Sequence, residues 1–223
     1  MAGSINVRSS GIIDNLDEYI FHIMGCGAIG SSVALQLCKM GARYFILYDM
    51  DKVEELNVGV SIYNLEDVGK HKTDALCKHL KLNNPMVDVT TVKGKFKDLY
   101  YQQSNDIVIL GFDNMKARMQ VVDFIEENKC KVMLIDGRMG AEEYQQYTFP
   151  EFKKRNYLRY WYSDDEASED PCNAKATSYC SNMAGSFIAN TVRKVVTGQM
   201  YEEQIQFLFP NMFLEKKQIS RNF

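Results

Sequence analysis

The feature that most constrains the fold is the glycine-rich segment at residues 25–30, GCGAIG, which lies between an apolar run and a helical pattern. The apolar run, residues 19–24, is typical of a buried parallel strand. Residues 28–40 then place apolar side chains at the spacing of one helix face, and residues 44–48 form a second apolar run. This order of strand, tight turn, helix and strand predicts a right-handed βαβ unit, so the sheet begins as parallel.

Alternating strand and helix patterns continue along the chain. Further strands are predicted at residues 87–92, 106–110, 131–135 and 143–149, and further helices at residues 68–82, 114–128 and 178–196. The alternation of polar and aromatic residues at 143–149 favours an antiparallel or half-exposed strand after the parallel set. We therefore predict a Rossmann-like α/β fold, with a doubly wound, mostly parallel sheet flanked by helices and an additional antiparallel edge.

The chain is predicted to form a single domain over residues 1–223, because doubly wound domains often exceed the average domain length. Residues 1–18 form an N-terminal segment before the first strand. Five acidic residues crowd the segment 163–172, which predicts an exposed, mobile loop. The tail from Tyr201 onward carries enough Phe and Leu residues to pack against the domain.

Composition excludes several classes of protein. A hydrophobic fraction of 46%, a charged fraction of 25% and a mean hydropathy of −0.29 are those of an ordinary globular protein. Apolar runs fall short of the roughly 20 residues that a bilayer span needs. Residues 1–11 also lack the order of a secretory signal, so we expect a cytoplasmic protein without a membrane partner. The net charge of −3 argues against nucleic acid as a partner.

The cysteines and histidines do not form a metal-binding pattern. Six cysteines are spread singly along the sequence, which contains no C-x-x-C pair. The three histidines complete no spaced ligand set with them, so we expect reduced thiols and no zinc site.

The glycine segment has the G-x-G-x-x-G spacing of a nucleotide-binding turn. Gly25, Gly27, Ala28 and Gly30 are predicted to bind a nucleotide phosphate through the tight turn and the positive end of the helix. Asp49 lies 19 residues beyond Gly30, at the end of the second strand, where its carboxylate can accept hydrogen bonds from ribose hydroxyls. The alternative is a turn used for helix–sheet packing with Asp49 as a cap. The spacing itself does not distinguish ATP from a dinucleotide.

Residues 48–57, YDMDKVEELN, resemble the stretch after the second strand in the ThiF/MoeB/HesA family, relatives of ubiquitin-activating enzymes. In that family an Asp is followed eight residues later by an Asn, and Asp49 and Asn57 match this spacing. The resemblance adds Asp51 and Asn57 to the residues expected to bind the nucleotide.

Two later segments resemble the same family. Residues 68–75 contain a glycine followed three residues later by a lysine at the start of a helix, which implies that Lys72 contacts phosphate. Residues 111–114 resemble the family's Asp-Asn pair after the fourth strand, which implies that Asp113 faces the phosphates and binds Mg²⁺. Lys72 and Asp113 are the implied catalytic residues. Adenylation needs positive charge close to the reacting phosphate and to the leaving pyrophosphate, which the lysine and a metal ion held by Asp113 would supply.

The resemblance spans residues 19–149 and implies an enzyme that uses ATP and Mg²⁺ without zinc. Such an enzyme adenylates the C-terminal carboxylate of a small ubiquitin-like protein or peptide, and commonly works as a homodimer. Some members pass the acyl group to a cysteine on a mobile loop, which makes Cys172 the candidate nucleophile, with an incidental or structural thiol as the alternative. Cys180, within or just before the last helix, is predicted to belong to the core.

Two adjacent positions depart from the family pattern. The arginine three residues after the motif Asn, and the glutamine that follows it, are replaced here by Val60 and Ser61. Valine cannot donate a hydrogen bond to phosphate, so either another cation substitutes or catalysis is weakened or lost. The candidate substitutes are Lys52, Lys70, Arg43 and Arg118, and Arg8 is the candidate for an arginine lent to a partner protomer.

Two further features each allow two interpretations. Arg138, after the strand at 131–135, is predicted either to reach a phosphate or the substrate tail or to form a surface salt bridge. The aromatic residues at 157–162 form either a partner-binding strip or part of the core.

Two other functions stay open at this point. A protein that keeps the nucleotide fold but has lost or altered catalysis would act through protein interaction. An NAD-dependent oxidoreductase fits the glycine turn and Asp49, but Asn57, Lys72 and Asp113 in family order argue against it.

Overall fold

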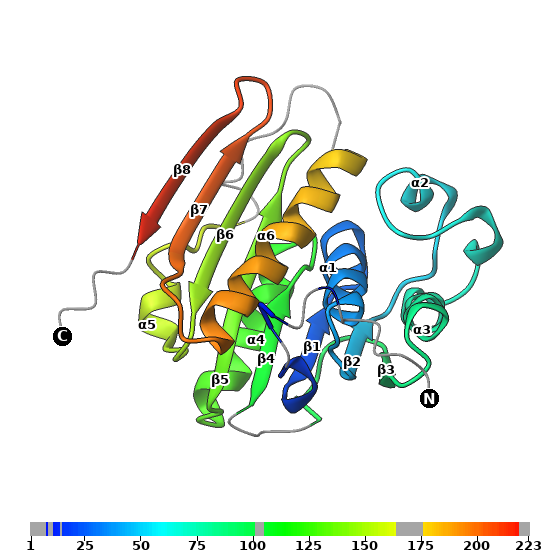
Figure 1. The fold of residues 1–223 in the computed structure, drawn as a ribbon, viewed down its shortest axis with the longest axis horizontal. Coiled ribbons are helices and arrows are strands. Elements are labelled where there is room, and N and C mark those ends of the chain that lie inside the picture. The colour runs from blue at the N-terminus through cyan, green and yellow to red at the C-terminus, as the bar shows by residue number, and fades with distance from the viewer. Residues whose placement is uncertain (1–7, 9–10, 14, 101–104, 164–175, 219–223) are drawn as a thin grey trace.

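The computed structural model describes residues 8, 11–13, 15–100, 105–163 and 176–218 of the chain (Figure 1). The strands are β1 (Ile20–Met24), β2 (Tyr44–Asp49), β3 (Asp88–Lys93), β4 (Asp106–Leu110), β5 (Val132–Met139), β6 (Glu143–Phe149), β7 (Glu202–Leu208) and β8 (Phe213–Gln218). The helices are α1 (Ala28–Lys39), α2 (Glu55–Val58), α3 (Lys72–Asn83), α4 (Met115–Glu127), α5 (Lys154–Tyr157) and α6 (Ser178–Val196), with 3₁₀ turns η1 (Leu16–Glu18) and η2 (Leu65–Asp67).

These strands form one sheet in the order β3-β2-β1-β4-β5-β6-β7-β8. Strands β1 to β5 pair in parallel, whereas β6, β7 and β8 each pair antiparallel to the preceding strand. The predicted fold class, a mostly parallel sheet with an antiparallel edge, is confirmed. Because β1 lies between β2 and β4, the chain reverses its direction of travel across the sheet at β1. Open α/β sheets bind ligands at this point, outside the carboxyl ends of the strands.

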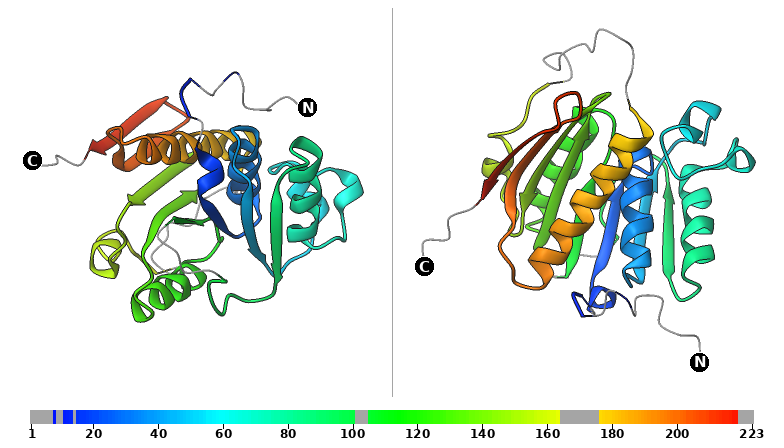
Figure 2. Two further views of the ribbon diagram at one scale, coloured as in Figure 1. Left: turned by 60° about the horizontal axis from the view of Figure 1, so that its bottom comes forward. Right: turned by 45° about the horizontal axis from the view of Figure 1, so that its top comes forward.

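Helices cover both faces of the sheet (Figure 2). One core contains Val33 of α1, Leu76 of α3 and Ile188 of α6. A second core contains Val121 of α4 and Tyr157 at the end of α5. The sheet is therefore doubly wound, as predicted. Within the described part of the chain, helices long and apolar enough to cross a membrane are absent.

Helix α6 lies directly against α1, although their sequences are far apart (Figure 1). The contact is close because residue 185 is glycine: a Cβ there would lie 2.4 Å from Ser32 Oγ. Gln36 Nε2 also donates to the carbonyl oxygen of Asn182, at 3.1 Å. Through this contact α6 continues the helix layer from β1 toward the antiparallel edge.

The start of α3 differs from the prediction. The helix begins at Lys72 rather than at residue 68, because the preceding residues pair with the loop after β2. Gly69 N donates to Val53 O at 2.9 Å, Val53 N donates to Lys70 O at 2.8 Å, and Lys72 N donates to Asp51 O at 3.0 Å. This pairing places Lys72 in the first turn of α3, beside the loop that carries Asp51.

The carboxyl half of the chain holds two further differences. Strand β5 runs to Met139 rather than ending at residue 135, because its second half pairs with β6, with Asp136 opposite Tyr147 and Arg138 opposite Gln145. The tail forms the β7–β8 hairpin, whose strands were not predicted, and it packs through buried Ile205 and Phe207. Most of the predicted acidic loop, residues 164–172, lies outside the described residues.

Replacing Gly185 by Ala is expected to lower the free energy of unfolding by about 1–3 kcal/mol, because the added methyl group overpacks the α1–α6 contact. Urea denaturation measures the change. Ser186→Ala on the exposed side of α6 is the matched control and is expected to change little. Equal stability of the two variants would show that α6 can shift away from α1 at no cost.

Candidate nucleotide site

The glycine loop between β1 and α1 folds back tightly on the sheet. Gly25 has a φ of +93°, and a Cβ on it would lie 2.9 Å from the backbone of Gly111. A Cβ on Gly30 would lie 1.8 Å from Gly25 O, so α1 can start here only without a side chain at position 30. Gly27, the N-cap of α1, instead faces open space, with no atom within 4 Å of a Cβ built on it. The loop thus leaves room at the first turn of α1, where backbone amides can meet an anion.

Asp49 at the end of β2 holds this loop in place. Its Oδ2 accepts a hydrogen bond from Cys26 N at 2.7 Å, and its Oδ1 accepts one from Asp51 N at 2.8 Å. The side chain is buried, and burial raises the pKa of Asp49 although these hydrogen bonds and the charge of Lys72 oppose the shift. Asp49 therefore organises the loop in addition to any contact with ribose, which stays a prediction.

Lys72 contacts one carboxylate at the carboxyl edge of the sheet and is influenced by the charge of two others. Its Nζ lies 3.0 Å from Asp51 Oδ2, and its side chain is largely buried. Burial alone would lower the pKa of Lys72, but the negative charges of Asp49, Asp51 and Asp113 together raise it. The structure thus brings together residues that the sequence had placed in three separate motifs.

Asp113 comes from the loop between β4 and α4. Its neighbour Asn114 is the N-cap of α4, accepting from Ala117 N at 2.7 Å and donating to Asp113 Oδ1 at 3.1 Å. The Asp-Asn pair therefore has a local structural reason: the Asn fixes the helix start and orients the exposed Asp carboxylate.

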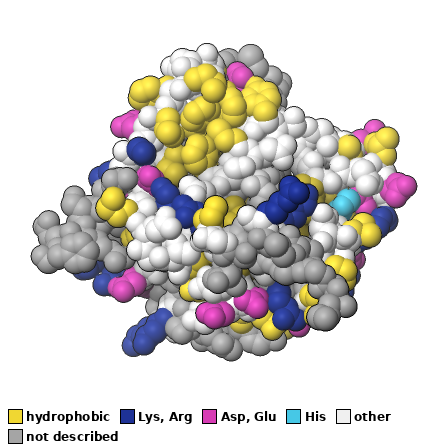
Figure 3. All heavy atoms as spheres, viewed as in Figure 1, with side chains coloured by type: hydrophobic (Ala, Val, Ile, Leu, Met, Phe, Trp, Pro, Cys, Tyr) yellow, Lys and Arg dark blue, Asp and Glu magenta, His cyan; other side chains and the backbone are white. Residues whose placement is uncertain are grey.

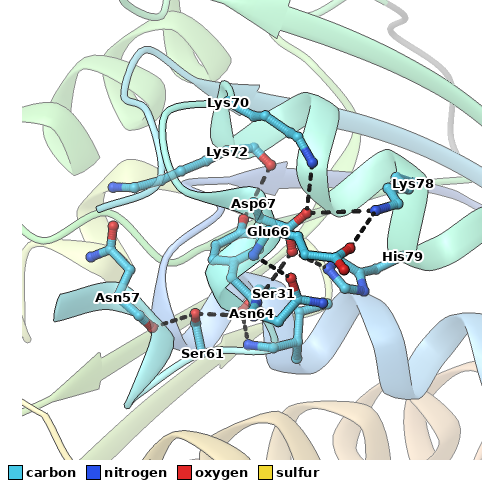
Figure 4. A network of polar contacts seen from close by, with 12 residues as sticks. Ser31, Asn57, Ser61, Asn64, Glu66, Asp67, Lys70, Lys72, Lys78 and His79 are labelled. Carbon is cyan, nitrogen blue, oxygen red and sulfur yellow. Dashed lines mark hydrogen bonds and ion pairs between the residues drawn. The ribbon is translucent and has the colours of Figure 1, made fainter. Parts of the chain in front are cut away.

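Asn57 is part of a local cap. Its Oδ1 accepts from Glu54 N at 2.9 Å, and its carbonyl oxygen accepts from Ser61 Oγ at 2.6 Å. Figure 4 shows the Asn57 side chain and the Lys72 ammonium extending to the same side of this loop network. Contact of Asn57 with a nucleotide stays a prediction.

Three of the four candidate substitutes for the missing arginine are held elsewhere. Arg118 is buried and donates to Asp136 and to the carbonyl oxygens of Leu110 and Phe112. Arg43 comes just before the start of β2, whereas Asp49 lies at the other end of the same strand. Lys70 contacts the buried carboxylate of Asp67 at 3.4 Å.

Lys52, exposed beside Asp51, is the candidate that stays open, and Arg8 is an exposed residue in the N-terminal segment.

Arg138 forms a salt bridge, as one of the two interpretations had it, but the salt bridge is buried rather than on the surface. Its guanidinium is buried, because β5 continues past residue 135 and directs Asp136 and Arg138 to the same face of the sheet. Arg138 Nε and Nη2 lie 2.9 and 2.8 Å from Asp136 Oδ2, and Nη1 donates to Tyr160 O at 2.6 Å. Neither phosphate nor a substrate tail can reach it there, and the ion pair is not on the surface.

Asp136 connects Arg138 to the loop between β4 and α4, which carries Asp113. Its carboxylate contacts Arg118 and Arg138 and accepts from Tyr157 Oη at 3.0 Å. Arg118 in turn holds the carbonyl oxygens on either side of Gly111, immediately before Asp113. The aromatic segment also packs here: Tyr157 is buried, and the guanidinium of Arg138 lies 4.9 Å from the Tyr162 ring centroid.

Asp136, the partner of both arginines, was not predicted from the sequence. One signal was available for Arg118, which lies four residues after the Asn114 cap, so its side chain points back toward the strand ends. Tyr63, a buried residue between α2 and η2, was also missed, because the family motifs do not include it.

The cysteine predictions have different outcomes. Cys172, the candidate nucleophile, lies outside the described residues. Cys180 is buried in the core as predicted, and burial raises its pKa to about 11. The five cysteines in the described part of the chain are free thiols.

Comparison with known proteins identifies the family. The ThiF family model matches residues 5–221. The chain belongs to the ThiF family. Enzymes of this family are ATP-dependent adenylyltransferases.

Two curated relatives differ in length and activity. A ubiquitin-like modifier-activating enzyme 5 from Oryza sativa is 35% identical over 134 residues, covering 52% of this chain and 32% of the relative. The tRNA threonylcarbamoyladenosine dehydratase of Haemophilus influenzae is 25% identical over 195 residues, covering 85% and 69%. This ThiF-family chain thus spans about a third of the length of the first relative.

Solved structures share the fold. E. coli MccB with ATP superposes with a TM-score of 0.73 at 18% identity, covering 98% of this chain and 69% of MccB. PaaA gives a TM-score of 0.68 at 19% identity, covering 92% and 65%. At these identities the likeness shows that the ThiF-family chain has the fold of both proteins.

Replacing Asp136 by Asn is expected to lower the free energy of unfolding by about 3–5 kcal/mol, because it leaves two buried guanidinium groups without their carboxylate. Chemical denaturation measures the loss. Asp123→Asn, which breaks the partly exposed contact with Lys154, is the matched control and should change little. A small loss in Asp136→Asn would mean that Arg118 and Arg138 find other acceptors.

Proposed function

We propose that this chain is an ATP-dependent adenylyltransferase that activates the C-terminal carboxylate of a small ubiquitin-like protein or peptide. The observation that carries the proposal is the position of Lys72, which contacts Asp51 at 3.0 Å and starts α3 beside the glycine loop and the open first turn of α1. The charges of Asp49 and Asp113 also act on Lys72. Family membership supports adenylation rather than the hydride transfer of an NAD-dependent oxidoreductase.

Adenylation has definite electrostatic needs. A substrate carboxylate oxygen bonds to the α-phosphorus of ATP, the bond from that phosphorus to the bridging oxygen breaks, and pyrophosphate leaves with the electron pair. The Lys72 ammonium can stabilise charge on the phosphate oxygens, and so can the amides at the start of α1. Asp49 holds the loop that presents those amides.

The acidic groups fit Mg²⁺. Asp113 is exposed, the Asp51 side chain is half exposed, and carboxylate oxygens are the donors that Mg²⁺ prefers. Among the described residues, groups of three or more His, Cys, Asp or Glu side chains able to hold a metal are absent. Mg²⁺ is commonly held by one or two carboxylates together with substrate phosphates. When bound, the ion would neutralise charge on the pyrophosphate.

The nature of the substrate rests on the relatives. The rice relative is named for activating a ubiquitin-like modifier, and MccB has been solved with the peptide MccA. Both names fit a C-terminal carboxylate on a small protein or peptide as the group that is activated here. Subsequent transfer of the acyl group to Cys172 is the further step that we propose.

A homodimer is proposed together with this activity. Figure 3 shows hydrophobic side chains gathered over the end of the molecule where the β7–β8 turn and the start of α6 lie. Exposed side chains of these elements include Tyr179, Met212, Phe213 and Leu214. A surface of this kind is suited to contact with a second protein chain.

A second candidate function has one specific observation in its favour. Val60 occupies the position of the family arginine. Arg118 and Lys70 are paired with Asp136 and Asp67, and Arg43 precedes the opposite end of β2, which leaves Lys52 as the substitute. A chain that binds ATP without adenylating a carboxylate would then act through protein interaction.

Calorimetric titration with Mg²⁺ present tests nucleotide choice. The wild-type protein is expected to bind ATP and not NAD, and Asp113→Ala is expected to weaken ATP binding at least tenfold because it removes a proposed metal ligand. Asp123→Ala, which removes a carboxylate of α4 paired with Lys154, is the control and should bind ATP as the wild type does. Binding of NAD, or unchanged affinity in Asp113→Ala, would contradict the proposal.

ATP–pyrophosphate exchange separates the two candidate functions. A synthetic peptide ending in Gly-Gly with a free carboxylate is expected to stimulate exchange, and the same peptide with a C-terminal amide is not, because the amide cannot attack phosphorus as a carboxylate does. Lys72→Met should reduce exchange by at least a hundredfold. ATP binding with no exchange for the carboxylate peptide would favour the protein-interaction function.

A further inference from the structure

Tyr63 joins two parts of the chain that the proposed function assigns to phosphate binding. It lies between α2 and η2, and its side chain is 4% exposed. The hydroxyl oxygen is 2.5 Å from the carbonyl oxygen of Cys26 and 3.1 Å from that of Lys72. Cys26 belongs to the glycine loop, and Lys72 begins α3. One buried hydroxyl group thus lies between the two elements.

The contact of Tyr63 with the Cys26 carbonyl oxygen fixes the direction of the Gly27 N–H. The carbonyl of Cys26 and the N–H of Gly27 belong to the same peptide unit, which is planar and trans, so the two groups point in opposite directions. Since Tyr63 holds the carbonyl on the buried side, the Gly27 N–H points to the other side. Open space also lies beside Gly27, since no atom comes within 4 Å of a Cβ built on it.

The other end of the Cys26 residue is also fixed. Its N–H donates to Asp49 Oδ2 at 2.7 Å. Asp49 and Tyr63 therefore hold Cys26 from both sides. With the N–H of Cys26 occupied by Asp49, the next amide along the loop, that of Gly27, is the one directed outward.

Surrounding contacts hold Tyr63 in this position. Tyr63 N donates to Ser61 Oγ at 3.3 Å, and Ile62 N donates to Ser31 Oγ on α1 at 3.4 Å. The Tyr63 ring centroid lies 6.2 Å from that of His79. His79 Nε2 is 2.6 Å from a carboxylate oxygen of Asp67, which is fully buried (Figure 4). These contacts anchor the segment to both α1 and α3.

The hydroxyl keeps its proton at neutral pH. Burial, together with nearby Cys26, Asp49 and Asp67, raises the pKa of Tyr63 well above its ordinary value. Tyr63 is therefore a permanent donor to the loop.

We propose that Tyr63 is a positioning residue of the nucleotide site, which orients the Gly27 amide toward phosphate by holding the Cys26 carbonyl and keeps the start of α3 against the glycine loop. This rests on the proposed function, because the role requires that the site bind a nucleotide. Tyr63 itself touches neither substrate nor metal, and acts through the backbone.

The test compares two buried tyrosines. Tyr63→Phe removes the hydroxyl group alone, and Tyr144→Phe is the matched control, since the Tyr144 hydroxyl donates to Gln146 on β6. Tyr63→Phe is expected to raise the Kd for ATP with Mg²⁺ about five- to tenfold, whereas Tyr144→Phe leaves it unchanged. Thermal unfolding of both variants shows whether a general loss of stability accounts for the result. Equal ATP affinity of Tyr63→Phe and wild type overturns the proposal.

A second measurement needs no nucleotide. In protein labelled with ¹⁵N-glycine, the Gly27 amide signal is identified by its loss in Gly27→Ala. That signal is expected to shift or broaden in Tyr63→Phe and to stay unchanged in Tyr144→Phe; an unchanged signal in both contradicts the positioning role. If the wild type binds no ATP, the proposed function fails. The Gly27 signal then still decides whether Tyr63 orients the loop.

Discussion

The site depends on the Asp49 carboxylate, which connects the end of β2 to the glycine loop after β1. Its two oxygens accept hydrogen bonds from Cys26 N and Asp51 N, so one buried side chain sets the path of two loops. A buried carboxylate is stable only when its hydrogen bonds are made, and here the backbone supplies them. The same group faces Lys72, so its charge also draws the ammonium toward the loop.

The parallel strands explain why distant motifs meet. Strands β2, β1 and β4 are neighbours in the sheet and end at the same edge, which brings together Asp49, the glycine loop and Asp113. Lys72 is not on a strand and reaches this edge by another route. The residues before it pair with the loop after β2, which brings the start of α3 beside Asp51. The backbone pairing at residues 69–72 is therefore as important to the site as the sheet itself.

Features that depend on residues close together in the chain could be predicted from the sequence. Features that depend on contacts between distant residues could not. Apolar runs and glycine spacing predicted β1, α1 and β2 within a residue or two, and the family motifs selected Lys72 and Asp113, which the structure brings together. Arg138 was misplaced because β5 is extended by pairing with β6, and strand pairing is not visible in either segment alone. The start of α3 was misplaced for the same reason, since residues 53 and 69 pair across a loop. Tyr63 was missed because its role lies in contacts with two carbonyl groups, which any residue can present.

The balance of charge shows what the replacement of arginine by Val60 means for this site. One lysine stands against three carboxyl groups, Asp49, Asp51 and Asp113, so the cluster carries excess negative charge before any phosphate arrives. A triphosphate adds more negative charge, and like charges at short range repel strongly in a partly buried site. The amides of the glycine loop offset part of this repulsion, which makes their orientation by Asp49 and Tyr63 more important than in a site with an additional arginine. Under the proposed function, a divalent cation held by the exposed carboxylates would supply further positive charge, and binding of nucleotide would then depend on binding of metal.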